Sequence, residues 1–354
     1  MSFTRLETDD FVVSIDAVSS TLFSNDSPSL TTAFTSSAQQ AGSSGDFYLN
    51  IFNTAATSSI QFAIAYGSSV GSGSTVYNAA VDGKTPTATV YGQWQDLVIG
   101  DENTNFTFGA ISSSDIFAMT FERARYKDAL FLGSLSLTLS GSSGSITLTD
   151  NSNYVTSVQF TEAGRVFQLI TGSFGTRANI TSRNTVDGYS ANSGSYGWLL
   201  PDIGAIILNP LALADFATSG GIGLVYTASS AAVSTGSSAT NGGNNSVLFR
   251  AISGSIVAAG TTNDFYINSQ ESITSDFIFV RPRSSAYNYS ENPSFISGST
   301  GEVLYSDFIN NPQTYITTIG LYNDTNQLLA VAKLSRPLPK DFTTEALIRI
   351  KLDF

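Results

Sequence analysis

The sequence predicts a mainly β protein with antiparallel sandwich-type domains and one or two short helices. Short runs rich in Phe, Tyr, Ile and Val recur along the 354 residues, and several of them alternate with period two, as half-buried strands do. Gly, Ser, Asn and Asp gather between these runs, where they favour turns. Charged residues make up only 12% of the chain, about half of the ~25% found in ordinary soluble domains. Low charge with many Phe and Tyr is typical of β-rich assembly proteins and of secreted adhesins, and both classes stay open.

The first two thirds of the chain contain most of the expected strands. Leu135, Leu137 and Leu139 alternate with Ser and Thr, the pattern of a half-buried strand, and a Gly/Ser turn then leads into a partner strand. The apolar run at 203–208 has strand length and no polar alternation, so we expect it to be covered on both faces. Strands are expected at 11–17, 47–53, 60–66, 87–91, 116–121, 135–139, 146–149, 166–171 and 203–208.

Up to three segments of this region are expected to be helical. Asn209 followed by Pro210 predicts a helix start, because Asn caps backbone N–H groups and Pro at the first helical position loses no hydrogen bond. This helix should end near Phe216. Residues 122–130 have the charges and the leucine of a second short helix, and residues 93–99 either continue the sheet or form a helical turn.

The chain is expected to divide at a Ser/Gly/Asn-rich segment. A length of 354 residues suggests two or three domains. Residues 229–246 contain almost no bulky side chain, which is typical of a loop or linker. The predicted domains are a mostly β region at 1–228, which can comprise two subdomains, and a C-terminal β-sandwich module at 247–354. Further strands are expected at 246–256, 264–267 and 277–280.

The last forty residues carry the clearest structural pattern. Two β-runs, 315–322 and 327–334, are joined by Asn and Asp residues that favour a tight turn. Pro337 and Pro339 are expected to stop the pairing, because proline donates no hydrogen bond to a neighbouring strand. At the very end, apolar residues alternate with a largely charged set, which predicts a strand with one buried face. We therefore expect a three-stranded antiparallel unit that includes the final strand.

Two segments of this closing stretch, IGLYNDTNQLLAVA and EALIRIKLDF, resemble structural proteins of contractile-tailed, myovirus-type bacteriophages. Three upstream segments are similar to virion structural proteins of cyanobacterial myophages: FERARYKDALFLGSLSLTLSG, SYGWLLPDIGAIILNPLAL and PRSSAYNYSENPSF. The resemblance extends over separated blocks of the chain and includes no catalytic motif. It implies a protein of the phage tail or baseplate.

Net charge and residue types exclude several classes of function. The chain has 16 basic and 28 acidic residues, a net charge of −12, so we expect no binding to nucleic acid, whose phosphates it repels. It contains neither Cys nor His, which excludes disulfides, thiolate zinc sites and His-dependent catalytic triads. No cofactor is expected. The residues at 1–10 lack an apolar secretory segment and no run approaches the ~20 apolar residues of a membrane span, so we expect no membrane insertion.

A carboxylate-based depolymerase stays open as another alternative. Glycosidases need only two carboxylates, and Asp101, Glu102, Asp115 and Glu122 are candidate acids in loops or at strand ends. Nothing in their spacing selects two of them, and turn formation explains such residues as well.

Aromatic residues near prolines form the core of a candidate interface. Such side chains can anchor a protein interface, stack on sugars or close the open end of a β-sandwich, and these three roles stay open. Between residues 333 and 354, five basic residues stand against three acidic ones, which suits docking onto an acidic partner. The candidate interface residues are Tyr287, Tyr289, Phe295, Tyr305, Phe308, Tyr315, Arg349, Lys351 and Phe354.

These observations together predict a virion structural protein. It would be made in the host cytoplasm, reside in the virion and act without catalysis in the tail or baseplate of a contractile-tailed phage. Its partners would be other tail or baseplate proteins or further copies of itself. The alternative is a tail fibre or receptor-binding protein that contacts glycans on the host surface.

Overall fold

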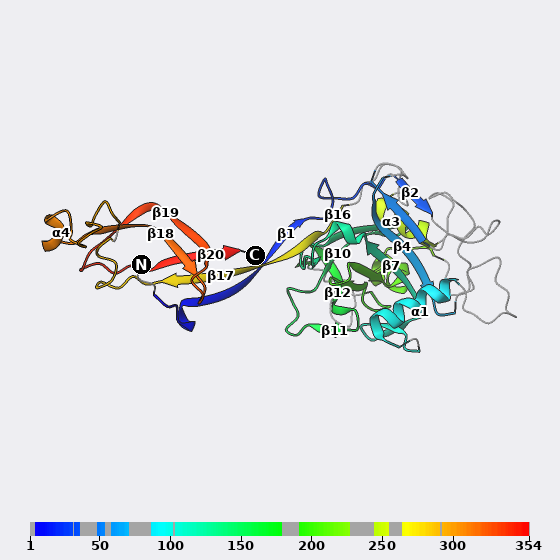
Figure 1. Cartoon of the computed structure of the whole chain (residues 1–354). Coiled ribbons are helices and arrows are strands. Elements are labelled where there is room, and N and C mark those ends of the chain that lie inside the picture. Colours follow the sequence, from blue (N-terminus) through cyan, green and yellow to red (C-terminus); the bar gives the residue numbers. More distant parts are fainter. Residues whose placement is uncertain are drawn as a thin grey trace. The chain divides into compact units, whose positions relative to one another are not determined.

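The computed structural model describes residues 4–30, 32–35, 48–53, 58–70, 86–101, 103–178, 191–226, 244–254, 264–290 and 292–353. The chain forms two compact units (Figure 1). Unit 1 comprises Met1–Ala17 and Ser272–Phe354, and unit 2 comprises Val18–Glu271. Along the sequence, unit 2 is therefore inserted between the two segments of unit 1.

The division between the units does not fall at the segment expected to be a linker. It falls within two strands, β1 (Phe11–Thr21) and β17 (Asn268–Val280), which pair with each other. Of the expected linker at 229–246, residues 229–243 lie outside the described residues, and residues 244–246 are the start of a helix. The predicted C-terminal module is replaced by a unit drawn from both ends of the chain, because strand pairing joins residues that are far apart in sequence.

A twelve-stranded sheet forms the framework of unit 2, and every pairing with a resolved register is antiparallel. The predicted fold class, mainly β and antiparallel, is thereby confirmed. Short strands β11 (Gln159–Thr161) and β13 (Thr176–Arg177) pair with β12 at its two ends. The other strands, in spatial order, are β16 (Phe265–Tyr266), β9 (Ser136–Gly141), β10 (Gly144–Asp150), β12 (Gly164–Ser173), β14 (Gly197–Leu200), β15 (Ala205–Leu208), β7 (Asp115–Phe121), β4 (Ile60–Ser68), β3 (Tyr48–Phe52) and β2 (Thr32–Thr35).

Both faces of this sheet are covered by apolar layers. In β15, Ile206 and Leu208 belong to one hydrophobic cluster, and Ile207 belongs to the other. This alternation explains why the run at 203–208 is apolar throughout, as predicted. Helix α3 (Asn244–Ser253) contributes to the first cluster; helix α1 (Pro86–Ile99) and the β5 (Phe106–Phe108)–β6 (Ile111–Ser113) hairpin contribute to the second.

Helix α1 corrects the expectation of a strand at 87–91. Its buried residues Thr87, Tyr91, Gln95 and Val98 recur every three to four positions, which places them on one side of a helix. Two of the four are polar, and the Gln95 amide donates to the carbonyl of Thr104 at 2.8 Å. A count of apolar residues therefore misses the buried stripe of this helix, because two of its four members are polar.

Two further segments differ from expectation. The strand expected at 246–256 is helix α3, whose buried Leu248, Phe249 and Ile252 have helical spacing. The helix expected at 122–130 is a single 3₁₀ turn, η2 (Arg123–Arg125), followed by strand β8 (Ala129–Leu130). Within the described residues there are four α-helices rather than one or two. The other expected strands are present, most of them with shifts of a few residues at their ends, but β17 begins nine residues before the strand expected at 277–280.

The helix expected after Asn209 is confirmed. Helix α2 (Pro210–Ala214) begins with proline, and the Asn209 side chain accepts a hydrogen bond from the backbone N–H of Leu211 at 3.1 Å. The helix ends before Phe216, and a 3₁₀ turn, η3 (Ala217–Ser219), follows. Capping and the fixed backbone of proline thus position this helix as the sequence predicts.

Unit 1 contains two separate β-structures. Its first sheet has the order β1, β17 and β20 (Ile348–Asp353), and the final strand alternates half-buried or buried residues with exposed ones, as predicted. Its second is a hairpin of β18 (Thr314–Tyr322) and β19 (Leu328–Lys340). Unit 1 also contains the short helix α4 (Asp307–Asn310) and a 3₁₀ turn, η1 (Thr8–Asp10).

The expected three-stranded closing unit is only partly present. Strands β18 and β19 form the predicted hairpin, but β20 pairs with β17 instead of with the hairpin. Pro337 and Pro339 do not end the pairing, because β19 continues to Lys340 with Pro339 opposite Tyr315. Each strand of a two-stranded hairpin has one unpaired edge, so the missing N–H of a proline can face outward without loss.

Candidate functional site

Unit 1 has almost no buried apolar side chains. Among the described residues, all buried apolar side chains except Ile278, Pro282 and Ile350 belong to unit 2. Ile278 and Ile350 lie opposite each other on β17 and β20 and are 7% and 6% exposed. Neither belongs to one of the two hydrophobic clusters. The two units therefore differ sharply in how much apolar surface they remove from water.

Unit 1 instead exposes many large apolar side chains, and they occur in β1, in the hairpin and in the segments between the strands. Isolated exposed apolar residues are ordinary, but a dense set in one unit marks a binding surface. The exposed set comprises Leu6, Phe11, Val12, Val13, Ile15, Tyr287, Tyr289, Leu304, Tyr305, Ile309, Tyr315, Tyr322, Leu328, Leu329, Val331, Phe342 and Leu347.

The β18–β19 hairpin carries apolar residues on both faces. Ile319 and Leu321 are half-buried on one face, and the other face presents Tyr322, Leu328 and Val331, which are 39%, 53% and 58% exposed. We call these last three residues the hairpin patch. Sequence analysis did not select Leu328 or Val331, although the lack of polar alternation in the run LLAVA was a signal that both faces are apolar.

Three of the predicted interface aromatics form a cluster. Phe295 packs edge-on against Phe308 with ring centroids 4.6 Å apart, and Tyr305 lies against the same ring at 6.3 Å. Phe295 and Phe308 are half-buried, whereas Tyr305 is exposed. The cluster therefore joins the segment around residue 295 to helix α4 and displays one tyrosine to solvent.

The remaining predicted tyrosines are separate from that cluster. Tyr287 has a left-handed backbone (φ 56°), its carbonyl accepts from the Thr314 hydroxyl, and its own hydroxyl is hydrogen-bonded to the Thr4 hydroxyl. Tyr289 and Tyr315 are each 62% exposed. Tyr287 thus has a structural role in joining segments, while Tyr289 and Tyr315 face solvent.

The predicted basic residues lie on the exposed face of β20. The Arg349 guanidinium lies 5.5 Å and the Lys351 ammonium 5.9 Å from the ring centroid of Phe277 on β17. Asp353 forms an ion pair with Lys351 at 2.9 Å and accepts from the Ser275 hydroxyl, contacts that lower the pKa of its carboxyl. Arg349 and Lys351 therefore cover an aromatic ring; Phe354 lies outside the described residues.

The candidate acids are engaged in local structure. Asp101 accepts hydrogen bonds from Thr104 and Asn103, which lower the pKa of its carboxyl and close a turn. Asp115 is buried and accepts from the Tyr66 hydroxyl at 2.5 Å. Glu122 is exposed and precedes η2, and Glu102 lies outside the described residues.

Comparison with protein families, with curated proteins and with solved structures finds no match for this chain. Among the residues that the structure describes, no helix is both long and apolar enough to span a bilayer.

Proposed function

We propose that this chain is a structural protein that acts through protein–protein interfaces, as a component of the tail or baseplate of a contractile-tailed phage. The observation that carries the proposal is the open apolar surface of unit 1. The resemblance of the closing segments to phage structural proteins supports the placement in a virion.

Unit 1 lacks the apolar burial that holds unit 2 together. Burying a large apolar side chain contributes about 1.5–3 kcal/mol, while fixing the backbone of each residue costs about 1–2 kcal/mol. A few buried apolar side chains and a set of half-buried ones offset little of that cost. A partner that covers the exposed set would supply the missing burial, so unit 1 reaches its full stability in an assembly.

Further copies of the same chain are the first partners that we propose. Unit 1 contains 8 basic and 12 acidic residues, counted over 1–17 and 272–354, whereas unit 2 contains 8 basic and 16 acidic residues. Like-charge repulsion between copies is therefore weaker at unit 1 than at unit 2. The open edges of the hairpin offer unpaired backbone groups for strand addition, and the hairpin patch offers apolar contact.

Sedimentation of the full chain across a wide concentration range tests self-association. We expect an oligomer for the wild type and a shift toward monomer for Val331→Lys, because a charge on an exposed residue disturbs the interface without disturbing the fold. Phe160→Lys, which alters a residue of unit 2 that is 72% exposed, serves as the matched control. A wild-type monomer at every concentration would contradict the proposal.

The virion role has a separate test. Purified particles of the phage that encodes the chain should contain it in fixed copy number, and its two units should fit density in the tail or baseplate. Absence of the chain from intact particles would exclude a structural role in the virion, whatever its oligomeric state.

A further inference from the structure

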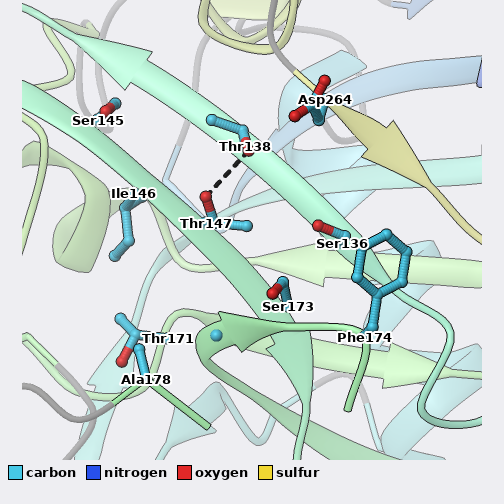
Figure 2. Close-up of a pocket in the computed structure, with 11 residues that line it drawn as sticks. Ser136, Thr138, Ser145, Ile146, Thr147, Thr171, Ser173, Phe174, Ala178 and Asp264 are labelled. Atoms are coloured by element: carbon cyan, nitrogen blue, oxygen red, sulfur yellow. Dashed lines mark hydrogen bonds between the residues drawn. The ribbon is translucent and has the colours of Figure 1, made fainter. Parts of the chain in front are cut away.

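A groove in unit 2 has the composition of a ligand site. It lies over the β9–β10 hairpin and the turn that follows β12, and its volume is about 430 Å³. Figure 2 shows hydroxyl side chains of Ser136, Thr138, Ser145, Thr147 and Ser173 around it. Small-molecule sites commonly have volumes of about 300–1,000 Å³, so the groove is large enough for one or two sugar rings.

The polar groups of the groove retain hydrogen-bonding capacity. Thr138 and Thr147 hydrogen-bond to each other at 3.0 Å. Within the described residues, no side-chain hydrogen bond engages the hydroxyls of Ser145 and Ser173 or the carboxylate of Asp264. A ligand rich in hydroxyl groups can both donate to and accept from such a lining.

An aromatic ring stands beside these hydroxyls in an unfavourable backbone conformation. Phe174 has φ 50° and is 55% exposed. With Gly175 (φ 68°) it forms the two-residue turn between β12 and β13, where Asn and Gly are the ordinary choices. A bulky residue in the left-handed region is strained, and such strain is an indicator of function.

The rest of the fold fixes this ring in place. The backbone N–H of Phe174 donates to the carbonyl of Leu135 at 3.0 Å, and that of Gly175 donates to the Thr149 hydroxyl at 2.8 Å. The ring packs against Tyr266 with centroids 5.5 Å apart. Phe174 is therefore a preorganised aromatic surface at the edge of a hydroxyl-lined groove.

From this arrangement we propose that the groove binds a neutral carbohydrate. Sugar hydroxyls would exchange hydrogen bonds with the Ser and Thr side chains and donate to the Asp264 carboxylate, and the C–H face of a ring would stack on Phe174. None of the described residues that line the groove is Lys or Arg, and unit 2 has 16 acidic against 8 basic residues. Uronate, sulfate or sialate groups are therefore disfavoured. The inference does not depend on self-association through unit 1.

The test uses the full chain on a glycan array that holds neutral hexose and N-acetylhexosamine oligosaccharides beside acidic ones, followed by calorimetric titration with the neutral glycan that binds best. We expect Phe174→Gly to weaken binding about tenfold or more and to leave the thermal unfolding temperature of unit 2 unchanged or raised, because glycine relieves the left-handed strain. Asp264→Asn, which keeps the shape of the lining, should weaken binding by a smaller factor.

Phe160→Gly is the matched control, because it removes an exposed phenylalanine of unit 2 outside the groove; it should leave the affinity unchanged. The inference is overturned if no neutral glycan binds, if only acidic glycans bind, or if Phe174→Gly and Phe160→Gly affect the affinity equally.

Discussion

Lys340 shows how unit 1 is held together without a large apolar core. Its ammonium is fully buried and donates to the carbonyls of Ser284 and Asp341 and to the side-chain oxygen of Asn288, at 3.0, 2.7 and 2.8 Å. Burial of a charge is costly unless its donors are satisfied, and an ammonium has three N–H groups. Two of these oxygens, those of Ser284 and Asn288, thus fix the end of β19 to the segment at 281–290.

Replacing this lysine should loosen unit 1. Lys340→Met removes three hydrogen bonds to a charged group, each worth about 1.5–3 kcal/mol. The carbonyls of Ser284 and Asp341 still accept from the Asn288 amide and from Thr344, so the net loss is smaller than the sum of the three. We expect faster hydrogen exchange in β19 by an amount that corresponds to about 2–4 kcal/mol. Lys333→Met, on the exposed part of the same strand, is the control and should change exchange little. Equal exchange in the two variants would show that the buried ammonium contributes nothing.

Tyr91 makes unit 2 sensitive to alkaline pH. Burial raises the pKa of its hydroxyl to about 12; a hydrogen bond with the backbone N–H of Phe106 opposes this, and the nearby Asp115 carboxylate reinforces it. The folded-state pKa is above the ordinary value of about 10, so the folded state favours the protonated form. The resulting stability is fully present below pH ~10 and is lost as the pH rises through the folded-state value.

Urea unfolding of unit 2 at pH 9 and at pH 11.5 checks this dependence. The free energy of unfolding should fall between the two pH values for the wild type and fall less for Tyr91→Phe. At pH 9 the variant should be less stable by about 1 kcal/mol, because it loses the hydrogen bond to the Ser113 carbonyl. A parallel fall in both proteins would assign the alkaline sensitivity to other groups.

At the scale of elements, β20 is the strand next to β17 in the first sheet of unit 1. It pairs with β17 along six residues, and it supplies the buried side chain of Ile350. Deletion of residues 345–354 should therefore expose the edge of β17 and abolish self-association. The thermal unfolding of unit 2 should remain unchanged, because its hydrophobic clusters contain no residue of this strand.

The deletion variant is best compared with the wild type by sedimentation and by calorimetry on the same samples. A truncated chain that still assembles would show that the final strand is not required for self-association.

Local patterns predicted some elements well and others poorly. The alternation at 348–353 and the capped start at Asn209 depend on neighbouring residues only, and both are present. Helix α1 was missed because buried Thr87 and Gln95 interrupt its apolar stripe. The pairing of β20 with β17 could not be predicted, since it joins residues about 70 positions apart in register pairs such as Ile278 with Ile350 and no local pattern selects that partner.

The candidate binding surfaces, like the helices and strands, were only partly predictable from the sequence. Sequence analysis selected exposed Tyr289 and Tyr315, but it gave the same weight to Phe295, whose ring packs on Phe308. It did not find the groove, because Ser and Thr are frequent throughout the chain and their convergence depends on strand pairing. The positive φ of Phe174 is likewise visible only in the folded chain.

At the scale of the whole molecule, the two units are different in kind. Unit 2 has clusters on both faces of its sheet and contains nearly all of the buried apolar side chains among the described residues. Unit 1 has an open apolar surface and is built from both ends of the chain. We therefore propose that unit 2 folds independently and that unit 1 reaches its full stability only in an assembly.

Hydrogen exchange of the full chain, measured at low and at high protein concentration, tests this difference between the units most directly. We expect the amides of β18, β19 and β20 to exchange quickly when dilute and to become protected as the protein associates, while those of the unit 2 sheet stay protected throughout. Slow exchange in unit 1 that is independent of concentration, in a chain that sediments as a monomer, would contradict the account.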